Sequence, residues 1–82
     1  MVLLLKGILV GGNNYDKKRA LLSQKLIEAR EETRLTQNQV ARTGILSQTE
    51  LSKIENGQRR VEFLLLLELA KLYKKDISFF KV

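Results

Sequence analysis

The stretch Thr36–Gly57, TQNQVARTGILSQTELSKIENG, decides the fold of this chain. It predicts two short helices, because each half opens with a hydroxyl residue followed three positions later by Gln or Glu. These pairs are Thr36 with Gln39 and Ser47 with Glu50. In such a capping box the hydroxyl accepts a hydrogen bond from the N3 backbone N–H, and the longer side chain accepts one from the cap residue's own N–H.

The two helices differ in what they can bury. Val40 and Ala41 face inward on the first helix, and Gly44 lies where a left-handed residue is wanted at its end. On the second helix, Leu51 and Ile54 form a narrow apolar seam, so most of its surface is polar. A helix with little to bury and many polar side chains is expected to face a polar partner.

The sequence on both sides of this stretch also predicts helices. Residues 16–33 carry Leu22, Leu26 and Ala29, with Leu21 beside them, at helical spacing after a cap at Asp16. Residues 62–74 carry apolar side chains around most of the helix circumference. A single core covers only one stripe of a helix, so part of this apolar surface is left for another partner. Residues 76–80 favour a last short helix capped by Asp76. We therefore predict an all-α fold, a compact bundle of about five short helices.

Composition narrows the class of protein. The 82 residues favour one domain at residues 15–82, preceded by an apolar extension at residues 1–14. The chain has no Cys or His, so the commonest metal ligands and the commonest general base are missing. We predict no catalytic residues, no metal site and no cofactor, and hence no enzyme. A net charge of +6 favours an anionic partner, with nucleic acid first.

The extension leaves several structures open. Residues 2–10 are too short an apolar run to span a bilayer and lack the features of a secretory signal, so we expect a cytoplasmic protein. The segment could be disordered, could pair with its copy across a dimer, or could cover the apolar face of residues 62–74.

These residues resemble the Cro/phage-repressor family of helix-turn-helix proteins, a group of small XRE-like regulators. The matching motifs are Thr36-Gln37, Ala41, Ser47-Gln48 and Ile54-Glu55-Asn56-Gly57, and the likeness extends through helix 62–74 to cover roughly residues 22–80. The resemblance implies a lambda-repressor-like DNA-binding domain. It further implies a sequence-specific transcriptional regulator, expected to be a repressor. Such a protein would insert residues of about 47–56 into the major groove as a homodimer on a palindromic operator.

The resemblance also implies roles for individual residues. Residues expected to read bases are Gln48, Thr49, Ser52 and Lys53. Residues expected to contact phosphates are Gln37, Asn56, Arg59 and Arg60. Leu64 and Leu65 are apolar where the family usually tolerates polar residues, so the residues expected in a dimer contact are Leu64, Leu65, Phe79, Phe80 and Val82. The chemistry agrees, because a Gln amide matches adenine bidentately and Lys suits the guanine acceptors.

Three further features bear on this assignment. Arg30 and Glu55 occupy places where the family often has a structural ion pair. The turn glycine usually lies one residue later, where this chain has Ile45. Glu50 places a carboxylate on the reading helix, where it either points back to Ser47 as a cap, weakens binding, or accepts from a cytosine amino group. These departures keep an alternative open: a protein-interaction module or antitoxin-like partner-binding protein on the same fold.

Overall fold

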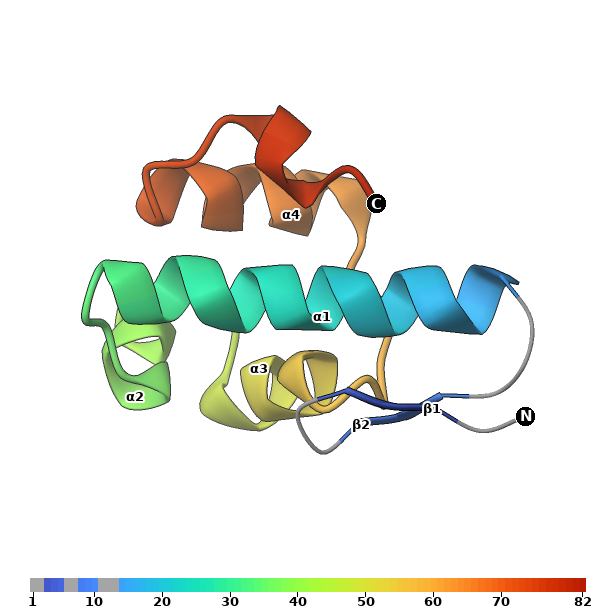
Figure 1. Ribbon diagram of the computed structural model, residues 1–82. Coiled ribbons are helices and arrows are strands. Elements are labelled where there is room, and N and C mark those ends of the chain that lie inside the picture. The colour runs from blue at the N-terminus through green and yellow to red at the C-terminus, as the bar shows by residue number, and fades with distance from the viewer. Residues whose placement is uncertain (1–2, 6–7, 11–13) are drawn as a thin grey trace.

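The computed structural model describes residues 3–5, 8–10 and 14–82 (Figure 1). Within these residues the chain forms four α-helices, one 3-10 helix and a short hairpin. The helices are α1 (Asn14–Glu32), α2 (Gln37–Ala41), α3 (Gln48–Glu55), α4 (Phe63–Leu72) and the 3-10 helix η1 (Ile77–Phe80). The strands are β1 (Leu3–Leu5) and β2 (Ile8–Val10).

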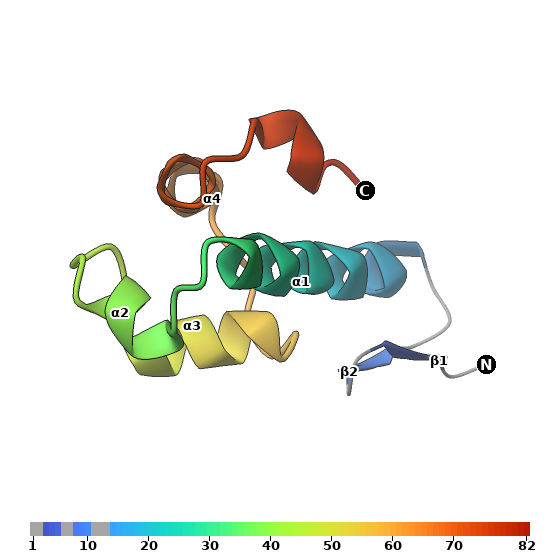
Figure 2. The same ribbon diagram turned by 60° about the vertical axis from the view of Figure 1, so that its left-hand side comes forward.

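Helix α1 is the central element. The α2–α3 pair packs along one side of it, and α4 with η1 covers the other side (Figures 1 and 2). The predicted helical fold, with about five short helices, is therefore confirmed. This arrangement leaves α3 covered by α1 on one side and open on the opposite side.

The N-terminal extension forms a hairpin. Strands β1 and β2 pair antiparallel, with Leu3 opposite Val10 and Leu5 opposite Ile8. The hairpin lies beside α1 on the side of α3, away from α4 (Figures 1 and 2). One of the three alternatives, that this segment covers the apolar face of α4, is therefore wrong. The strands pair with each other and lie on the opposite side of α1. The predicted domain boundary at residues 14 and 15 stays a prediction.

Both predicted capping boxes are present. Thr36 Oγ1 accepts from the Gln39 N–H at 3.1 Å, and Gln39 Oε1 accepts from the Thr36 N–H at 2.8 Å. Ser47 Oγ and Glu50 Oε1 form the same pair of bonds at 3.1 and 3.2 Å. The start of α1 differs from the prediction: the helix begins at Asn14, so Asp16 lies in its first turn rather than at its cap.

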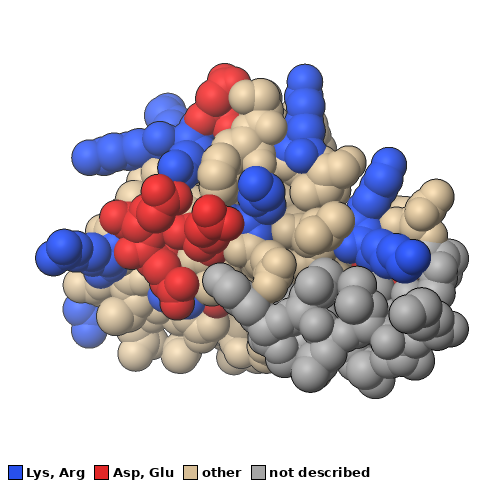
Figure 3. All heavy atoms as spheres, viewed as in Figure 1, with Lys and Arg blue, Asp and Glu red and all other residues tan. Residues whose placement is uncertain are grey.

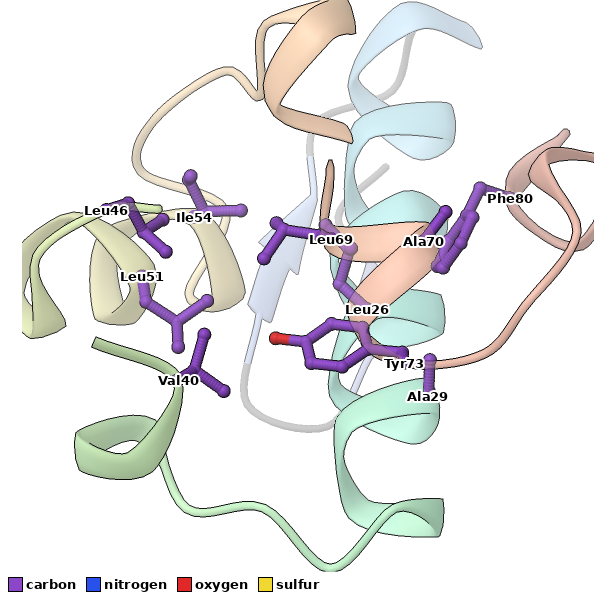
Figure 4. Close-up of a cluster of buried hydrophobic side chains, with 10 residues drawn as sticks. All are labelled: Leu26, Ala29, Val40, Leu46, Leu51, Ile54, Leu69, Ala70, Tyr73 and Phe80. Atoms are coloured by element: carbon purple, nitrogen blue, oxygen red, sulfur yellow. The ribbon is translucent and has the colours of Figure 1, made fainter. Parts of the chain in front are cut away.

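The core lies where α1, α2, α3 and α4 meet. Its side chains, drawn in Figure 4, are Leu26, Ala29, Val40, Leu46, Leu51, Ile54, Leu69, Ala70, Tyr73 and Phe80. The inward positions predicted on α2 and α3 are confirmed at Val40, Leu51 and Ile54, whereas Ala41 is only partly buried. Leu21, placed beside the α1 stripe by the sequence, is exposed because Ala20 and Ser23 take the inward positions of that part of the helix.

The turn between α2 and α3 explains the displaced glycine. Gly44 has a φ of +83°, the left-handed conformation that ends the α2 segment. Ile45 has no positive φ and packs its side chain against the core. The chain therefore makes its left-handed turn one residue earlier and uses the following position for an apolar contact.

Of the residues predicted for a dimer contact, Leu64 and Val82 are exposed, Leu65 and Phe79 are partly buried against the core, and Phe80 is buried. Phe80 is 4% exposed and lies in the chain's own core, because η1 folds back over α1. We therefore leave Phe80 out of the proposed dimer contact. Leu64 is 66% exposed, and Phe63, which the sequence analysis did not select, is 64% exposed. Among the described residues, no helix is both long enough and apolar enough to cross a membrane.

Candidate nucleic-acid interface

The outer face of α3 carries the four residues predicted to read bases. Gln48, Thr49 and Lys53 are exposed, and Ser52 is partly buried. In the part of the chain that the structure describes, none of these four side chains forms a hydrogen bond or ion pair. The eight residues of α3 span about 12 Å at 1.5 Å per residue, a length that fits the major groove. This face is therefore free to make contacts outside the chain.

A buried ion pair fixes the end of α3 to α1. Arg30 donates from Nε to Glu55 Oε2 at 2.7 Å and from Nη2 to Oε1 at 3.0 Å. The hydrogen bonding that Arg30 donates to Glu55 raises the pKa of the Arg30 guanidinium, which therefore stays charged. Arg30 also donates from Nη1 to the carbonyl of Leu35, at 2.8 Å. The structural pair expected from the sequence is present, and it ties α1, α3 and the start of the α2 segment together.

Gln37 joins the same network. Its Nε2 donates to Glu55 Oε1 at 2.9 Å, and the side chain is partly buried. Its role as a phosphate contact remains a prediction. An amide nitrogen has two N–H groups, so one can bond Glu55 while the second remains available to an external acceptor. The network thus holds this predicted contact in one position at the edge of α3.

Two further bonds from α1 reach the segment at the end of α3. Ser23 Oγ donates to the carbonyl of Ile54 at 2.8 Å, and Arg19 Nη2 donates to the carbonyl of Gly57 at 3.1 Å. Sequence reasoning missed both residues. The available signal was their spacing, since residues 19, 23, 26 and 30 follow one face of a helix. Polar residues among the apolar ones on that face indicate bonds to a neighbouring helix end.

Glu50 points back along the helix, as the capping interpretation requires. The Ser47 N–H donates to its carboxylate and lowers the pKa of Glu50. This part of the cap is present above that lowered pKa and is lost as pH falls through it. Arg59 Nη2 also lies 3.6 Å from Glu50 Oε2, with both side chains substantially exposed. An exposed pair at this distance is weak, so a stronger anion can replace it.

Positive charge gathers in the loop that follows α3. Asn56, Arg59 and Arg60 are all exposed, directly after the last turn of the helix. On the α1 face shown in Figure 3, by contrast, one group of Asp and Glu side chains lies at the left, further acidic atoms lie at the top, and Lys and Arg project around them. A surface of mixed charge attracts DNA less than the end of α3 does.

Comparisons with known proteins agree with this geometry. A family model described as helix-turn-helix matches residues 26–80, which is two thirds of the chain. The chain belongs to the Cro/phage-repressor type of helix-turn-helix proteins. This helix-turn-helix protein is accordingly a DNA-binding transcriptional regulator and not an enzyme. The first 25 residues, with the hairpin and the first turns of α1, lie outside the match.

The fold of this helix-turn-helix protein is also similar to a solved structure. The restriction-modification controller protein C.AhdI from Aeromonas hydrophila superposes with a TM-score of 0.76 at 23% identity. The match covers 84% of this chain and 100% of that one, and at this identity it shows the shared fold. No curated protein matches the chain by sequence.

Proposed function

We propose that this helix-turn-helix protein is a homodimeric repressor that inserts α3 into the major groove of a palindromic operator. The observation that carries the proposal is the outer face of α3, where Gln48, Thr49 and Lys53 are exposed and have no partner among the described residues. Amide, hydroxyl and ammonium groups are the ones that read base edges. Their backbone, by contrast, is held firmly by the Arg30–Glu55 pair.

Phosphate contacts would set the position of α3 on the duplex. Arg59 and Arg60 lie on one side of α3, in the loop after its last turn, and Gln37 lies at the start of α2. Contacts on both sides of the groove fix the register of the helix, while base contacts determine sequence preference. Asn56, at the C-terminal end of α3, completes the proposed set.

The proposed dimer uses the exposed apolar side chains of α4. Phe63, Leu64 and Leu67 are 64%, 66% and 38% exposed, and an exposed group of large apolar side chains is typical of a contact with another protein. Leu65, Phe79 and Val82 stay in the proposed contact, with Phe63 and Leu67 as additions from the structure. A two-fold dimer would present two copies of α3 about 34 Å apart, one turn of DNA.

Repression would follow from occupancy. A dimer that covers two half-sites one turn apart blocks that DNA from other proteins, including polymerase. The solved structure with the similar fold is a restriction-modification controller, so genes of that kind are among the targets to examine.

The test is selection of genomic DNA fragments by the purified protein at two salt concentrations. The proposal expects an enriched palindrome with half-sites one turn apart. If each subunit of a dimer places Arg59 and Arg60 on phosphates, four cations are involved. The log of the binding constant should then fall with log salt with a slope of about −3 to −4. Enrichment of single half-sites would exclude the dimer, and binding without any enriched sequence would exclude base reading by α3.

A second candidate function is a protein-interaction or antitoxin-like module, in which α4 grips a different protein. The exposed Phe63 and Leu64 favour it, since apolar surface suits any protein partner. Salt dependence separates the two functions. An apolar contact responds little to salt, whereas DNA binding weakens steeply.

A further inference from the structure

A cavity of about 270 Å³ lies between the N-terminal half of α1 and the segment that joins α3 to α4. We call it the α1 cavity. Its apolar walls are Tyr15, Leu22, Val61 and Val82. Tyr15 is 54% exposed, so part of this apolar surface meets water even where the proposed dimer contact covers Val82. An apolar ligand that covered it would gain hydrophobic free energy.

The charged residues around the α1 cavity are all cations. They are Lys18, Arg19 and Arg60. None of them takes part in an ion pair formed between residues that the structure describes. Asp16 lies in the same part of α1 but does not line the cavity. The electrostatic complement of this rim is therefore an anion.

Two of these cations converge on one aromatic ring. The guanidinium carbons of Arg19 and Arg60 lie 6.0 and 5.6 Å from the centre of the Tyr15 ring. Arg19 comes from α1 and Arg60 from the α3–α4 connection, 41 positions later in the chain. Arg19 donates one N–H to the Gly57 carbonyl, and its other N–H groups can donate to a ligand. The fold thus brings two planar donors to the edge of an apolar cavity, the arrangement that suits a carboxylate.

We propose that the α1 cavity binds a small carboxylate with an apolar body, and that its binding competes with DNA. Its volume of about 270 Å³ lies just below the usual range of small-molecule sites. A chain of octanoate length, with ten non-hydrogen atoms, matches this space. Its tail contacts Tyr15, Leu22 and Val61, and its carboxylate accepts from the arginines.

The competition with DNA rests on the proposed function, whereas binding of the carboxylate does not. Arg60 lines the cavity and is also a proposed phosphate contact. Arg19 donates a hydrogen bond to the carbonyl of Gly57. Gly57 is at the start of the loop that carries Arg59 and Arg60. A carboxylate that takes donors from Arg60 and Arg19 removes one phosphate contact and loosens the anchor of the others. By linkage, DNA must weaken carboxylate binding by the same factor.

The binding test is a chemical-shift titration of the free protein with sodium octanoate, at constant ionic strength. A ligand of this size should saturate the protein with a dissociation constant on the order of 1 mM or lower. The shifts should concentrate at Tyr15, Lys18, Leu22 and Val61. Octan-1-ol, which has the same tail without charge, should bind at least about tenfold more weakly. No saturable shift, or an equal response to octan-1-ol, overturns the proposal.

Matched variants locate the site. Lys18→Glu places an anion on the rim of the cavity and should weaken octanoate binding at least about tenfold, since like charges repel. Lys17→Glu makes the same charge change at the neighbouring exposed position, which does not line the cavity, and should leave the titration close to that of the unmodified protein. Equal losses in both variants overturn the site. Shifts of the same amides on simple protein dilution would assign the cavity to a second copy of the chain and overturn it as well.

The coupling test measures affinity for the selected DNA with and without saturating octanoate. The unmodified protein and Lys17→Glu should lose affinity for DNA several-fold, whereas Lys18→Glu should lose clearly less at the same octanoate concentration. Unchanged affinity in the unmodified protein overturns the coupling. Failure of the protein to bind any DNA would overturn the proposed function instead, and the titration of the free protein would still decide the carboxylate site.

Discussion

The outer face of α3 and the outer face of α4 are both exposed, yet their chemistry is opposite. On α3 the exposed side chains are polar, and the helix beneath them is held by caps and by the Arg30–Glu55 pair. On α4 the exposed side chains include the apolar Phe63, Leu64 and Leu67, beside the charged Glu68 and Lys71, and the first turn has no side-chain cap. The fold needs neither set for its own core. The polar set suits base edges in water, and the apolar set suits the same set on another copy of the chain.

The largest loss of operator affinity should come from a polar substitution on the apolar face of α4. Leu64→Glu puts a charge into the proposed dimer contact and should yield monomers. Loss of the second half-site should lower operator affinity by about 10² to 10⁴. Leu21→Glu, at an exposed apolar position on α1, is the matched control and should remain dimeric. Sedimentation and DNA titration measure both. A monomeric variant with undiminished operator affinity would separate the α4 face from DNA binding.

Removal of the support beneath α3 should be the next largest effect. Arg30→Met leaves the buried Glu55 carboxylate without its partner and should cost about 3–5 kcal/mol of unfolding free energy. Arg42→Met, at an exposed position on the end of α2, should change it by about 0.5 kcal/mol or less.

Urea denaturation measures the unfolding free energy of these variants and of the double variant Arg30→Met/Glu55→Gln. The double variant should regain part of the lost stability, because it has no unpaired buried charge. A double variant no more stable than Arg30→Met would show that packing, and not charge, accounts for the loss.

A smaller loss of DNA affinity should distinguish the residues that read bases from those that contact phosphates. Gln48→Ala should cost about 1–3 kcal/mol on the selected site and much less on random DNA, because base contacts are lost. Arg59→Ala should weaken binding to both DNAs alike, because phosphates carry no sequence. Fluorescence anisotropy with the two DNAs measures each ratio. Equal losses on both DNAs for Gln48→Ala would mean that α3 does not read the sequence.

The smallest change in unfolding free energy should come from a substitution in the core, which lies between the two faces. Burial raises the pKa of the Tyr73 phenol, which therefore keeps its proton. Its hydroxyl has no hydrogen-bond partner among the described residues. Since an unsatisfied buried donor is costly, Tyr73→Phe should raise the unfolding free energy by about 1 kcal/mol.

Tyr15→Phe, at an exposed position, should leave the unfolding free energy unchanged. Thermal and urea unfolding of the two variants measure the difference. A clear loss of stability in Tyr73→Phe would show that the hydroxyl makes a favourable interaction in solution.

Local signals in the sequence predicted the helix-turn-helix correctly. Caps act within four residues, so the pairs Thr36–Gln39 and Ser47–Glu50 could be found without any knowledge of packing. The left-handed residue at Gly44 was equally local. The family spacing supplied the Arg30–Glu55 pair, which joins residues 25 positions apart.

The sequence by itself thus determined the helices, the turn and the polar outer face of α3, because helix ends and periodicity depend on near neighbours. The tertiary structure decided which apolar residues are left for a partner. Phe80 was predicted to lie in the dimer contact and is buried, whereas Phe63 and Leu67 were not predicted there and are exposed. Periodicity cannot choose among the sides of a helix that is apolar nearly all round. The choice depends on where α1 and η1 pack, and distant residues set that packing together with the Arg19 and Ser23 anchors.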